Sequence, residues 1–324
     1  MRNKTIHDSE KNSWFITGGA GFIGSHIVDY LIAKGKKVTV YDNLSTGKEL
    51  FIKHHTHNKN FRFVKGDLHD VDLLCKSIKG SDSVFHLAAH ADVKSGFEDH
   101  MIDHDQNVEM THNVLEAMYR NNIKNIAFSS TSSVYGNATI HPTPEDHPLI
   151  PTSLYGATKA ACEQYIHAYA SYYEMNSYIF RFVSWIGERY NHGIIYDVLK
   201  KLKKNKNEVE LFSDGSPKKS SLYVGDGISA IFTVIDKAKE KTNIYNIGNN
   251  YLHTIDEITD FILQSAGATD TKKNWLGKNS NWKGDNVHVL LSIEKLEALG
   301  WKPKVTIREG IKRTVNYLQN ASLL

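Results

Sequence analysis

The sequence predicts an α/β protein with a doubly wound parallel sheet and a smaller, mixed α/β lobe towards the carboxyl end. Three observations support this. The chain has 324 residues, 40% of them hydrophobic, which suffices for one large domain and a smaller one. In the first half, short apolar runs alternate with longer helical patterns, as in repeated βαβ units. A glycine-rich segment directly follows the first apolar run, as it does where a strand turns into a helix.

Six short apolar runs, each followed by small or polar residues, are the expected strands of the sheet. They lie at 14–17, 38–42, 61–65, 84–88, 125–129 and 178–182. Helices are expected between them, notably at 25–34, 105–121 and 153–174. The last of these is rich in alanine, and Pro151-Thr152-Ser153 is typical of a helix start.

After Gly187 the pattern changes to shorter, mixed elements: a helix at 194–204, a strand at 209–212 and a turn at Asp214-Gly215. The segments 226–237 and 244–247 have the pattern of a helix and strand that return to the main sheet. We therefore expect a first domain over 1–187, rejoined by 225–250, and a mainly separate second lobe over 188–324.

Composition disfavours several classes of protein. The formal net charge is +3 and basic residues alternate with acidic ones, so nucleic-acid binding is not indicated; Lys200 to Lys206 is interpreted as the solvated end of a helix. The two cysteines, Cys75 and Cys162, are too few for a disulfide framework and favour a reducing compartment. Met1 to Ser13 is polar, unlike a signal peptide, and no later run approaches a membrane span. We expect a cytoplasmic protein.

His54, His55 and His57 lie close together in the sequence, so a metal site and a solvated loop are the two interpretations. No Cys, Asp or Glu accompanies them at ligand spacing. We therefore expect a solvated loop and no metal.

The glycine series Gly18, Gly21 and Gly24 follows the first expected strand and opens a helix. In a dinucleotide-binding turn the first glycine permits the tight turn, the second lets the backbone approach the pyrophosphate, and the third lets helix and strand pack closely. Asp42 ends the second strand, where a carboxylate can hold the adenosine ribose hydroxyls and repel a 2′-phosphate. The first domain is thus predicted to be a Rossmann-type domain that binds NAD in preference to NADP.

Tyr155 and Lys159 are four residues apart and therefore lie on one face of a helix. A phenol is a poor base at neutral pH, but a nearby ammonium favours the phenolate, so we expect Lys159 to lower the pKa of Tyr155. Upstream, the segment Ser129 to Gly136 brings a cluster of hydroxyls to the end of the fifth strand. One of them can bond a reacting oxygen, although serines there also make local turns and caps.

Seven segments together resemble the extended short-chain dehydrogenase/reductase family, most closely its UDP-glucose 4-epimerase-like, NAD-dependent epimerases and dehydratases. The likeness spans nearly the whole chain. The segments are Thr17 to Ser25, Tyr41 to Gly47, Gly66-Asp67, His86 to Ala89, Ser129 to Gly136, Tyr155 to Lys159 and Leu299 to Pro303.

The resemblance implies roles for individual residues. Tyr155 is the catalytic base, Thr131 contacts the sugar 4-hydroxyl, and Lys159 orients cofactor and tyrosine. The residues expected to bind NAD are Gly18, Gly21, Phe22, Ile23, Gly24, Asp42, Asn43, Ser45, Thr46, Gly47, Asp67, Leu68, Leu87, Ala88, Ala89, Asn107, Ser129, Tyr155, Lys159 and Phe182. Those expected to bind substrate are Val93, Thr131, Ser132, Ser184, Ile194, Ile195, Lys219 and His288.

The expected reaction is a 4-epimerisation of a nucleotide sugar, with a UDP-sugar as the first choice of substrate. In an epimerase of this kind the base removes the hydroxyl proton as hydride passes to NAD, the 4-keto sugar rotates, and hydride returns to its other face. Related dehydratases carry Asp-Glu directly after the threonine, and related decarboxylases usually keep the glutamate, whereas this chain has Ser132 and Ser133. Serine cannot supply the general acid or base that elimination needs near neutral pH.

Some residues depart from the family pattern. Ser184 stands where many relatives have Asn, and Lys219 stands where they often have an Arg that grips the pyrophosphate. Lysine keeps the charge but loses the bidentate fork. His288 is the closest candidate for a second cation. The substrate and the outcome therefore stay open: a dehydrogenase, reductase or 4,6-dehydratase, and a non-catalytic NAD-sensing protein, are the alternatives. By analogy with the family, helices 105–121 and 153–174 are expected to pair in a homodimer.

Overall fold

The computed structural model of the chain describes residues 12–93, 95–277 and 288–321. Most of Met1 to Ser13, the polar segment described above as unlike a signal peptide, lies outside these ranges. No helix within them is both long enough and apolar enough to cross a membrane.

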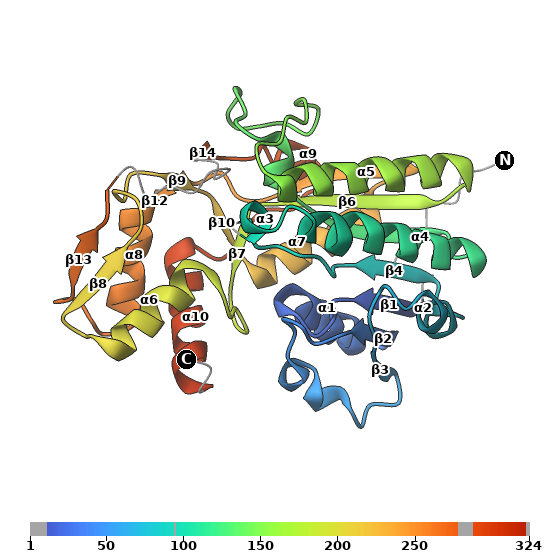
Figure 1. Cartoon of the computed structure of the whole chain (residues 1–324), viewed down its shortest axis with the longest axis horizontal. Coiled ribbons are helices and arrows are strands. Elements are labelled where there is room, and N and C mark those ends of the chain that lie inside the picture. Colours follow the sequence, from blue (N-terminus) through green and yellow to red (C-terminus); the bar gives the residue numbers. More distant parts are fainter. Residues whose placement is uncertain (1–11, 94, 278–287, 322–324) are drawn as a thin grey trace.

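A parallel sheet forms the centre of the molecule (Figure 1). In the described part of the chain it has seven strands in the order β11-β6-β5-β4-β1-β2-β3. Each of the six expected strands overlaps one of them, and the predicted fold class is confirmed. The strands are β1 (Ser13–Thr17), β2 (Lys37–Asp42), β3 (Phe61–Lys65), β4 (Ser83–His86), β5 (Asn125–Thr131), β6 (Asn176–Phe182) and β11 (Thr242–Ile247).

The order of the strands places a ligand site between β1 and β4. From β1 the chain proceeds to β2 on one side, and later returns to β4 on the other side. Thr17 pairs with Tyr41 of β2 and with His86 of β4, so the three strands end level with one another. Ligands of open α/β sheets bind outside the carboxyl ends of the strands at such a switch point.

Helices cover both faces of the sheet because its strands are apolar on both sides. Trp14 and Ile16 belong to one hydrophobic cluster and Phe15 to the other, as the alternation along a strand requires. The first cluster includes residues of α1 (Phe22–Ala33) and α7 (Val224–Lys237). The second includes residues of α2 (Val71–Ile78), α4 (Met110–Arg120) and α5 (Leu154–Tyr172).

The second half of the chain adds a lobe beside the carboxyl end of the sheet (Figure 1). The expected helix and strand at its start are present as α6 (Gly193–Lys204) and β8 (Glu208–Leu211). The helices α8 (Ile255–Ser265) and α10 (Ile307–Asn320) pack with α6. Three small sheets complete this part, and α9 (Glu294–Glu297) packs near β11. Their strands are β7 (Ser184–Ile186) with β10 (Ser221–Tyr223), β8 with β13 (Lys272–Trp275), and β9 (Lys218–Lys219) with β12 (His253–Thr254) and β14 (His288–Val289).

A buried ion pair joins α5 to the middle of the sheet. Arg181 of β6 donates from Nη2 to Oε2 of Glu163 at 2.7 Å, and both side chains are at most 4% exposed. The Ser130 hydroxyl of β5 donates to the other carboxylate oxygen. Arg181 Nη1 donates to the Tyr135 hydroxyl, which in turn donates to Asn246 of β11 at 2.8 Å. One network thus connects three neighbouring strands with the helix that carries Tyr155.

We expect Glu163→Ala to lower the free energy of unfolding by about 3–5 kcal/mol, because it leaves a guanidinium buried without its partner. Urea unfolding followed by circular dichroism measures the loss. Glu116→Ala is the matched control: it removes a pair with Arg120 on the exposed surface of α4 and should cost only about 0.3–0.5 kcal/mol. Equal losses in the two variants would contradict a structural role for the buried pair.

Candidate functional site

The glycine turn after β1 is built so that no side chain fits. Gly18 has φ +69°, and a Cβ there would lie 2.7 Å from the backbone nitrogen of Ala88. A Cβ on Gly24 would overlap the carbonyl oxygen of Gly18. The Gly21 N–H closes the turn on the same carbonyl at 3.1 Å, and α1 begins at Phe22 with no side-chain cap. The first N–H groups of α1 are therefore available to a phosphate.

Asp42 at the end of β2 holds this turn. Its buried carboxylate accepts the Ala20 N–H at 2.9 Å and the Leu44 N–H at 2.8 Å. Burial raises the pKa of Asp42, and these two hydrogen bonds oppose the rise. Each carboxylate oxygen has a further lone pair, so ribose hydroxyls can still bind. Next to it, Asn43 donates to Asp67 at 2.9 Å, which ties the loops after β2 and β3 together.

Two cavities that share lining residues lie along the carboxyl edge of the sheet. The larger, about 930 Å³, is lined by Gly21, Phe22, Ser45, Thr46 and Ala89, five of the residues predicted to bind NAD. Both cavities are lined by Asp92, Gly193, Ile194, Lys219 and Ile255, so they form one hollow between the sheet and the second lobe.

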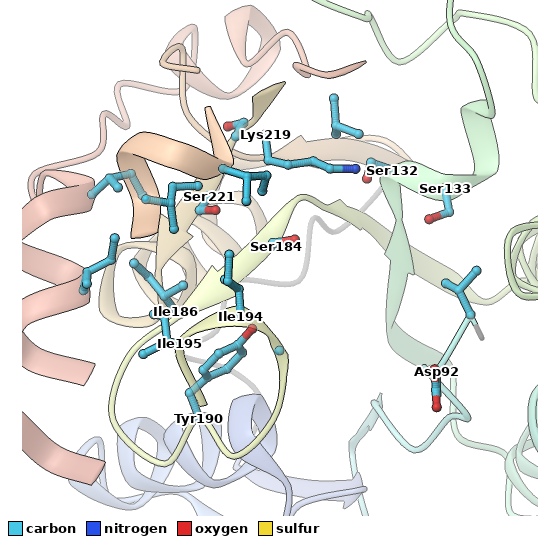
Figure 2. A pocket seen from close by; sticks show the side chains of 18 residues that line it. Asp92, Ser132, Ser133, Ser184, Ile186, Tyr190, Ile194, Ile195, Lys219 and Ser221 are labelled. Atoms are coloured by element: carbon cyan, nitrogen blue, oxygen red, sulfur yellow. The ribbon is translucent and has the colours of Figure 1, made fainter. Parts of the chain in front are cut away.

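The smaller cavity, about 430 Å³, holds most of the residues predicted to bind substrate. Figure 2 shows Ser132 and Ser133 on one wall and the Ile194-Ile195 pair on another, with the Lys219 side chain extending towards Ser132. Six of the eight predicted residues line it: Val93, Ser132, Ser184, Ile194, Ile195 and Lys219. His288 instead stands exposed on β14, with its ring 4.3 Å from that of His141.

Tyr155 and Lys159 lie on α5, and Thr131 lies at the end of β5. The Ser153 side chain caps this helix by accepting the Gly156 N–H at 3.1 Å. Thr131, the last residue of β5, hydrogen-bonds the Tyr155 phenol. Lys159 is 2% exposed, and its ammonium lies 4.0 Å from the centre of the Phe128 ring. The structure therefore brings Thr131 and Tyr155 together, while Lys159 lies one helical turn beyond Tyr155 and packs on Phe128.

Burial controls the protonation of this group. It raises the pKa of Tyr155 to about 12, against the opposing hydrogen bond from Thr131 and with a further rise from the charge of Asp103. The pKa of Tyr155 thus rises, whereas Lys159 was expected to lower it. Burial likewise lowers the pKa of Lys159 to about 8, so the ammonium still carries its charge at pH 7.

Sequence reasoning missed a second cluster of polar groups at this edge. Both ring nitrogens of His90 are hydrogen-bonded. Nδ1 lies 2.9 Å from Oδ1 of Asp103, and Nε2 lies 2.9 Å from Oγ of Ser95. Asp103 is fully buried, and Gly96 packs directly against its other oxygen. His90 also lines the larger cavity. The only sequence signal was the position of His90 directly after Ala88-Ala89 at the end of β4.

Several residues predicted to contact NAD hold the walls of the cavity in place. Asn107, in the π-helical segment η4 (His104–Glu109), accepts the His90 N–H at 2.9 Å and donates to Thr158 at 3.1 Å. Leu68 is 4% exposed in the core, and Ser129 donates to the His86 carbonyl at 3.4 Å. The Leu87 N–H bonds the Thr17 carbonyl.

Comparison with known proteins identifies the family. Residues 14–248 match the NAD dependent epimerase/dehydratase family. The chain belongs to this family. A putative UDP-glucose 4-epimerase of Methanocaldococcus jannaschii is 36% identical over 311 residues, which cover 94% of this chain and 98% of that protein.

Solved structures of an epimerase and of a dehydratase from the NAD-dependent epimerase/dehydratase family are similar to the structure of this chain. A UDP-glucose 4-epimerase of Thermotoga maritima with UDP-glucose has a TM-score of 0.86 at 31% identity, covering 96% of this chain and 99% of that chain. A dTDP-glucose 4,6-dehydratase of Streptomyces venezuelae with NAD has a TM-score of 0.88 at 28% identity, covering 96% and 99%. The fold alone therefore does not separate the two reactions.

NAD is the cofactor of this enzyme family, and the glycine turn fits it. The glycine turn provides space, the uncapped amino end of α1 provides donors for phosphate, and the Asp42 carboxylate, which bonds the turn at Ala20, provides acceptors for ribose hydroxyls. Gly21 and Phe22 of this turn line the larger cavity.

Two glycine substitutions should separate packing from cofactor binding. Gly24→Ala forces a Cβ into the Gly18 carbonyl and should cost about 1–3 kcal/mol of stability. Gly21→Ala meets only that oxygen at 3.2 Å, so it should fold with a smaller loss yet bind NAD more weakly, because its Cβ obstructs the pyrophosphate. Thermal unfolding and calorimetric titration with NAD check the two effects. A Gly21→Ala variant with unchanged NAD affinity would count against this placement of the pyrophosphate.

Proposed function

We propose that the protein is an NAD-dependent 4-epimerase of a nucleotide sugar. The observation that carries the proposal is the composition of the substrate wall: Thr131 bonds Tyr155, and the next two residues, Ser132 and Ser133, line the smaller cavity with hydroxyls only. Reversible oxidation at a sugar hydroxyl needs a base and a hydrogen-bond partner, which are present. Elimination of water needs a further general acid or base, which serine does not supply.

Within this proposal each residue has one task. NAD, when bound, supplies the hydride acceptor and donor. Thr131 holds the reacting hydroxyl in line with Tyr155, and the phenolate of Tyr155 takes its proton and later returns it. The hydrogen bond from Thr131 favours that phenolate, and Lys159 is assigned to orienting the cofactor; the burial that raises the pKa of Tyr155 keeps bulk water away from the keto sugar.

We assign NAD to the domain over 1–187, with β11 added to its sheet, and the sugar nucleotide to the lobe over 188–324. Lys219 contributes the cation for the diphosphate, since it lines both cavities. A UDP-sugar is the first choice of substrate because the Thermotoga maritima relative was solved with UDP-glucose.

A 4,6-dehydratase is the second candidate, and one observation favours it. The Asp92 carboxylate lies in the wall of both cavities and could serve as the acid that Ser132 and Ser133 lack. The product of the reaction distinguishes the two.

For partners, we propose a homodimer that pairs α4 and α5. Three tyrosines on these helices, Tyr119, Tyr165 and Tyr172, are 44–78% exposed and offer aromatic surface that a second copy can cover. A cytoplasmic location stays a prediction from the use of cysteine.

We expect the purified enzyme to convert one member of a panel of UDP-, dTDP-, GDP- and CDP-sugars into its 4-epimer, with no net formation of NADH. Tyr155→Phe should lower kcat by about 10²- to 10⁴-fold without unfolding the protein. Tyr172→Phe, at the exposed end of the same helix, is the control and should leave kcat unchanged. Chromatography with mass spectrometry follows the products.

A stable 4-keto-6-deoxy product would overturn the epimerase proposal in favour of the dehydratase. Stoichiometric NADH would indicate a dehydrogenase.

Asp103→Asn should shift the pH dependence of kcat towards lower pH. The Asp103 carboxylate raises the pKa of Tyr155, because a phenolate beside a carboxylate is disfavoured. A neutral amide removes this effect, so the pKa falls and the phenolate fraction at a given pH increases. Asp105→Asn, on the exposed face of the same segment, is the control and should leave the profile in place. An unshifted profile for Asp103→Asn would exclude an electrostatic influence on Tyr155.

A further inference from the structure

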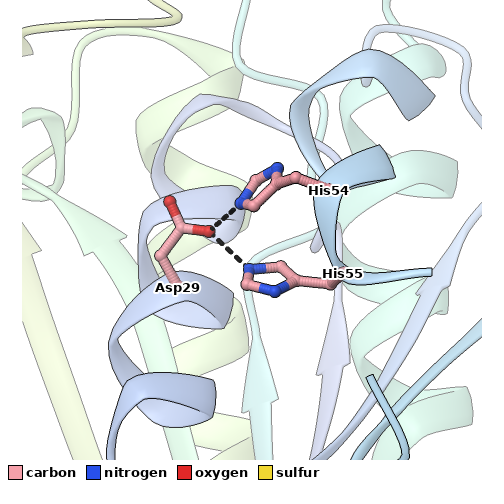
Figure 3. Close-up of side chains that lie close together, drawn as sticks. All are labelled: Asp29, His54 and His55. Atoms are coloured by element: carbon pink, nitrogen blue, oxygen red, sulfur yellow. Dashed lines mark hydrogen bonds and ion pairs between the residues drawn. The ribbon is translucent and has the colours of Figure 1, made fainter. Parts of the chain in front are cut away.

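Three potential metal ligands from two distant segments converge on the outside of the sheet. Asp29 lies on α1, and His54 and His55 form the last two residues of the short helix η3 (Lys53–His55). Asp29 Oδ1 is 2.8 Å from Nε2 of His54 and 2.7 Å from Nε2 of His55, and Figure 3 shows both rings directed at the one oxygen. The sequence pattern did not indicate this arrangement, because Asp29 lies 25 residues before His54.

We propose that Asp29, His54 and His55 bind a divalent transition-metal ion of the Zn²⁺ type. The three ligand atoms all lie within 4.8 Å of one another. Zn²⁺ takes imidazole nitrogen and carboxylate oxygen at about 2.0–2.2 Å, so small rotations of the two rings away from Oδ1 make room for the ion. In the ion-bound form each neutral ring carries its proton on Nδ1, so that the Nε2 lone pair is free for the ion.

Arg189 holds the carboxylate in the orientation that the site needs. Its Nη2 lies 2.6 Å from Asp29 Oδ2, so one oxygen is engaged by the guanidinium and the other faces the two histidines. Carboxylates that bind metals are commonly hydrogen-bonded in this way. Selectivity comes from the two imidazoles of the ligand set, because Mg²⁺ and Ca²⁺ prefer oxygen ligands and Zn²⁺ binds imidazole nitrogen well.

The segment that carries the histidines is anchored, and its surface is open. Phe51 and Ile52, just before η3, are at most 2% exposed and hold this segment against the domain. The His54 side chain is 50% exposed and that of His55 12%, so an ion can enter and water can complete its coordination. Neither the two histidines nor Asp29 is among the described residues that line the two cavities, so this site is separate from the proposed catalytic one.

A bound ion cross-links α1 to the loop after β2. The ion pair of Arg189 with Asp29 extends this link to the segment that follows β7. Because the ion binds the folded chain and not the unfolded one, it raises the melting temperature as its concentration rises.

The test is calorimetric titration of the full chain, purified without a histidine tag and treated with chelator, with ZnCl₂ at pH 7.5. We expect one saturable site per chain and none for MgCl₂. His54→Gln and His55→Gln should each weaken Zn²⁺ binding by at least about tenfold, since even changes around metal ligands cost this much. His57→Gln is the matched control, because His57 is exposed on the same segment and is not one of the three ligands.

Binding should also weaken at pH 5.5, because ligating imidazoles must give up a proton. Circular dichroism confirms that each variant is folded, and His54→Gln keeps the test decisive if a change at the less exposed His55 disturbs folding. Absence of a saturable site overturns the proposal, as does equal loss in His57→Gln. Epimerase activity is not part of the readout, so the result is independent of the proposed function.

Discussion

The structure of the site depends on one buried ion pair, Glu163 with Arg181. The pair places α5 against β5 and β6, and through Tyr135 and Asn246 it reaches β11. Since a buried charge without its partner is costly, the helix cannot slide along the sheet without breaking several hydrogen bonds at once. This restraint holds Tyr155 at the distance from β5 at which Thr131 bonds its phenol. The buried ion pair thus helps to keep Tyr155 in contact with Thr131.

The remaining parts of the site follow from the strand order. Because β1, β2 and β4 end level, their loops surround one point, and each loop is tied to a neighbour by a polar contact. Asp42 bonds the glycine turn, and Asn107 bonds the backbone of His90. The second lobe closes the hollow with Ile194 and Lys219. The positions proposed for cofactor and substrate therefore adjoin as a result of topology, since the two cavities share five lining residues.

Burial at this wall has opposite effects on the two titratable groups of α5. The same desolvation disfavours the phenolate of Tyr155 and the ammonium of Lys159, so the pKa of the first rises and that of the second falls. The two pKa values move in the directions that keep each group neutral. The hydrogen bond from Thr131 favours the phenolate of Tyr155, and the charge of the buried Asp103 acts against it.

The sequence by itself determined the fold class, the position of the glycine turn and the placement of Tyr155 and Lys159 four residues apart on one helix, because each depends on neighbouring residues and their periodicity. The six sheet strands of the first half followed from short apolar runs for the same reason. Only the tertiary structure decided that Glu163 meets Arg181, that His90 meets Asp103, and that Asp29 joins His54 and His55. Such contacts between separate segments depend on strand order and helix packing, which no local pattern contains. His54 and His55, which were expected to lie in a solvated loop, thus meet the carboxylate of Asp29 on α1.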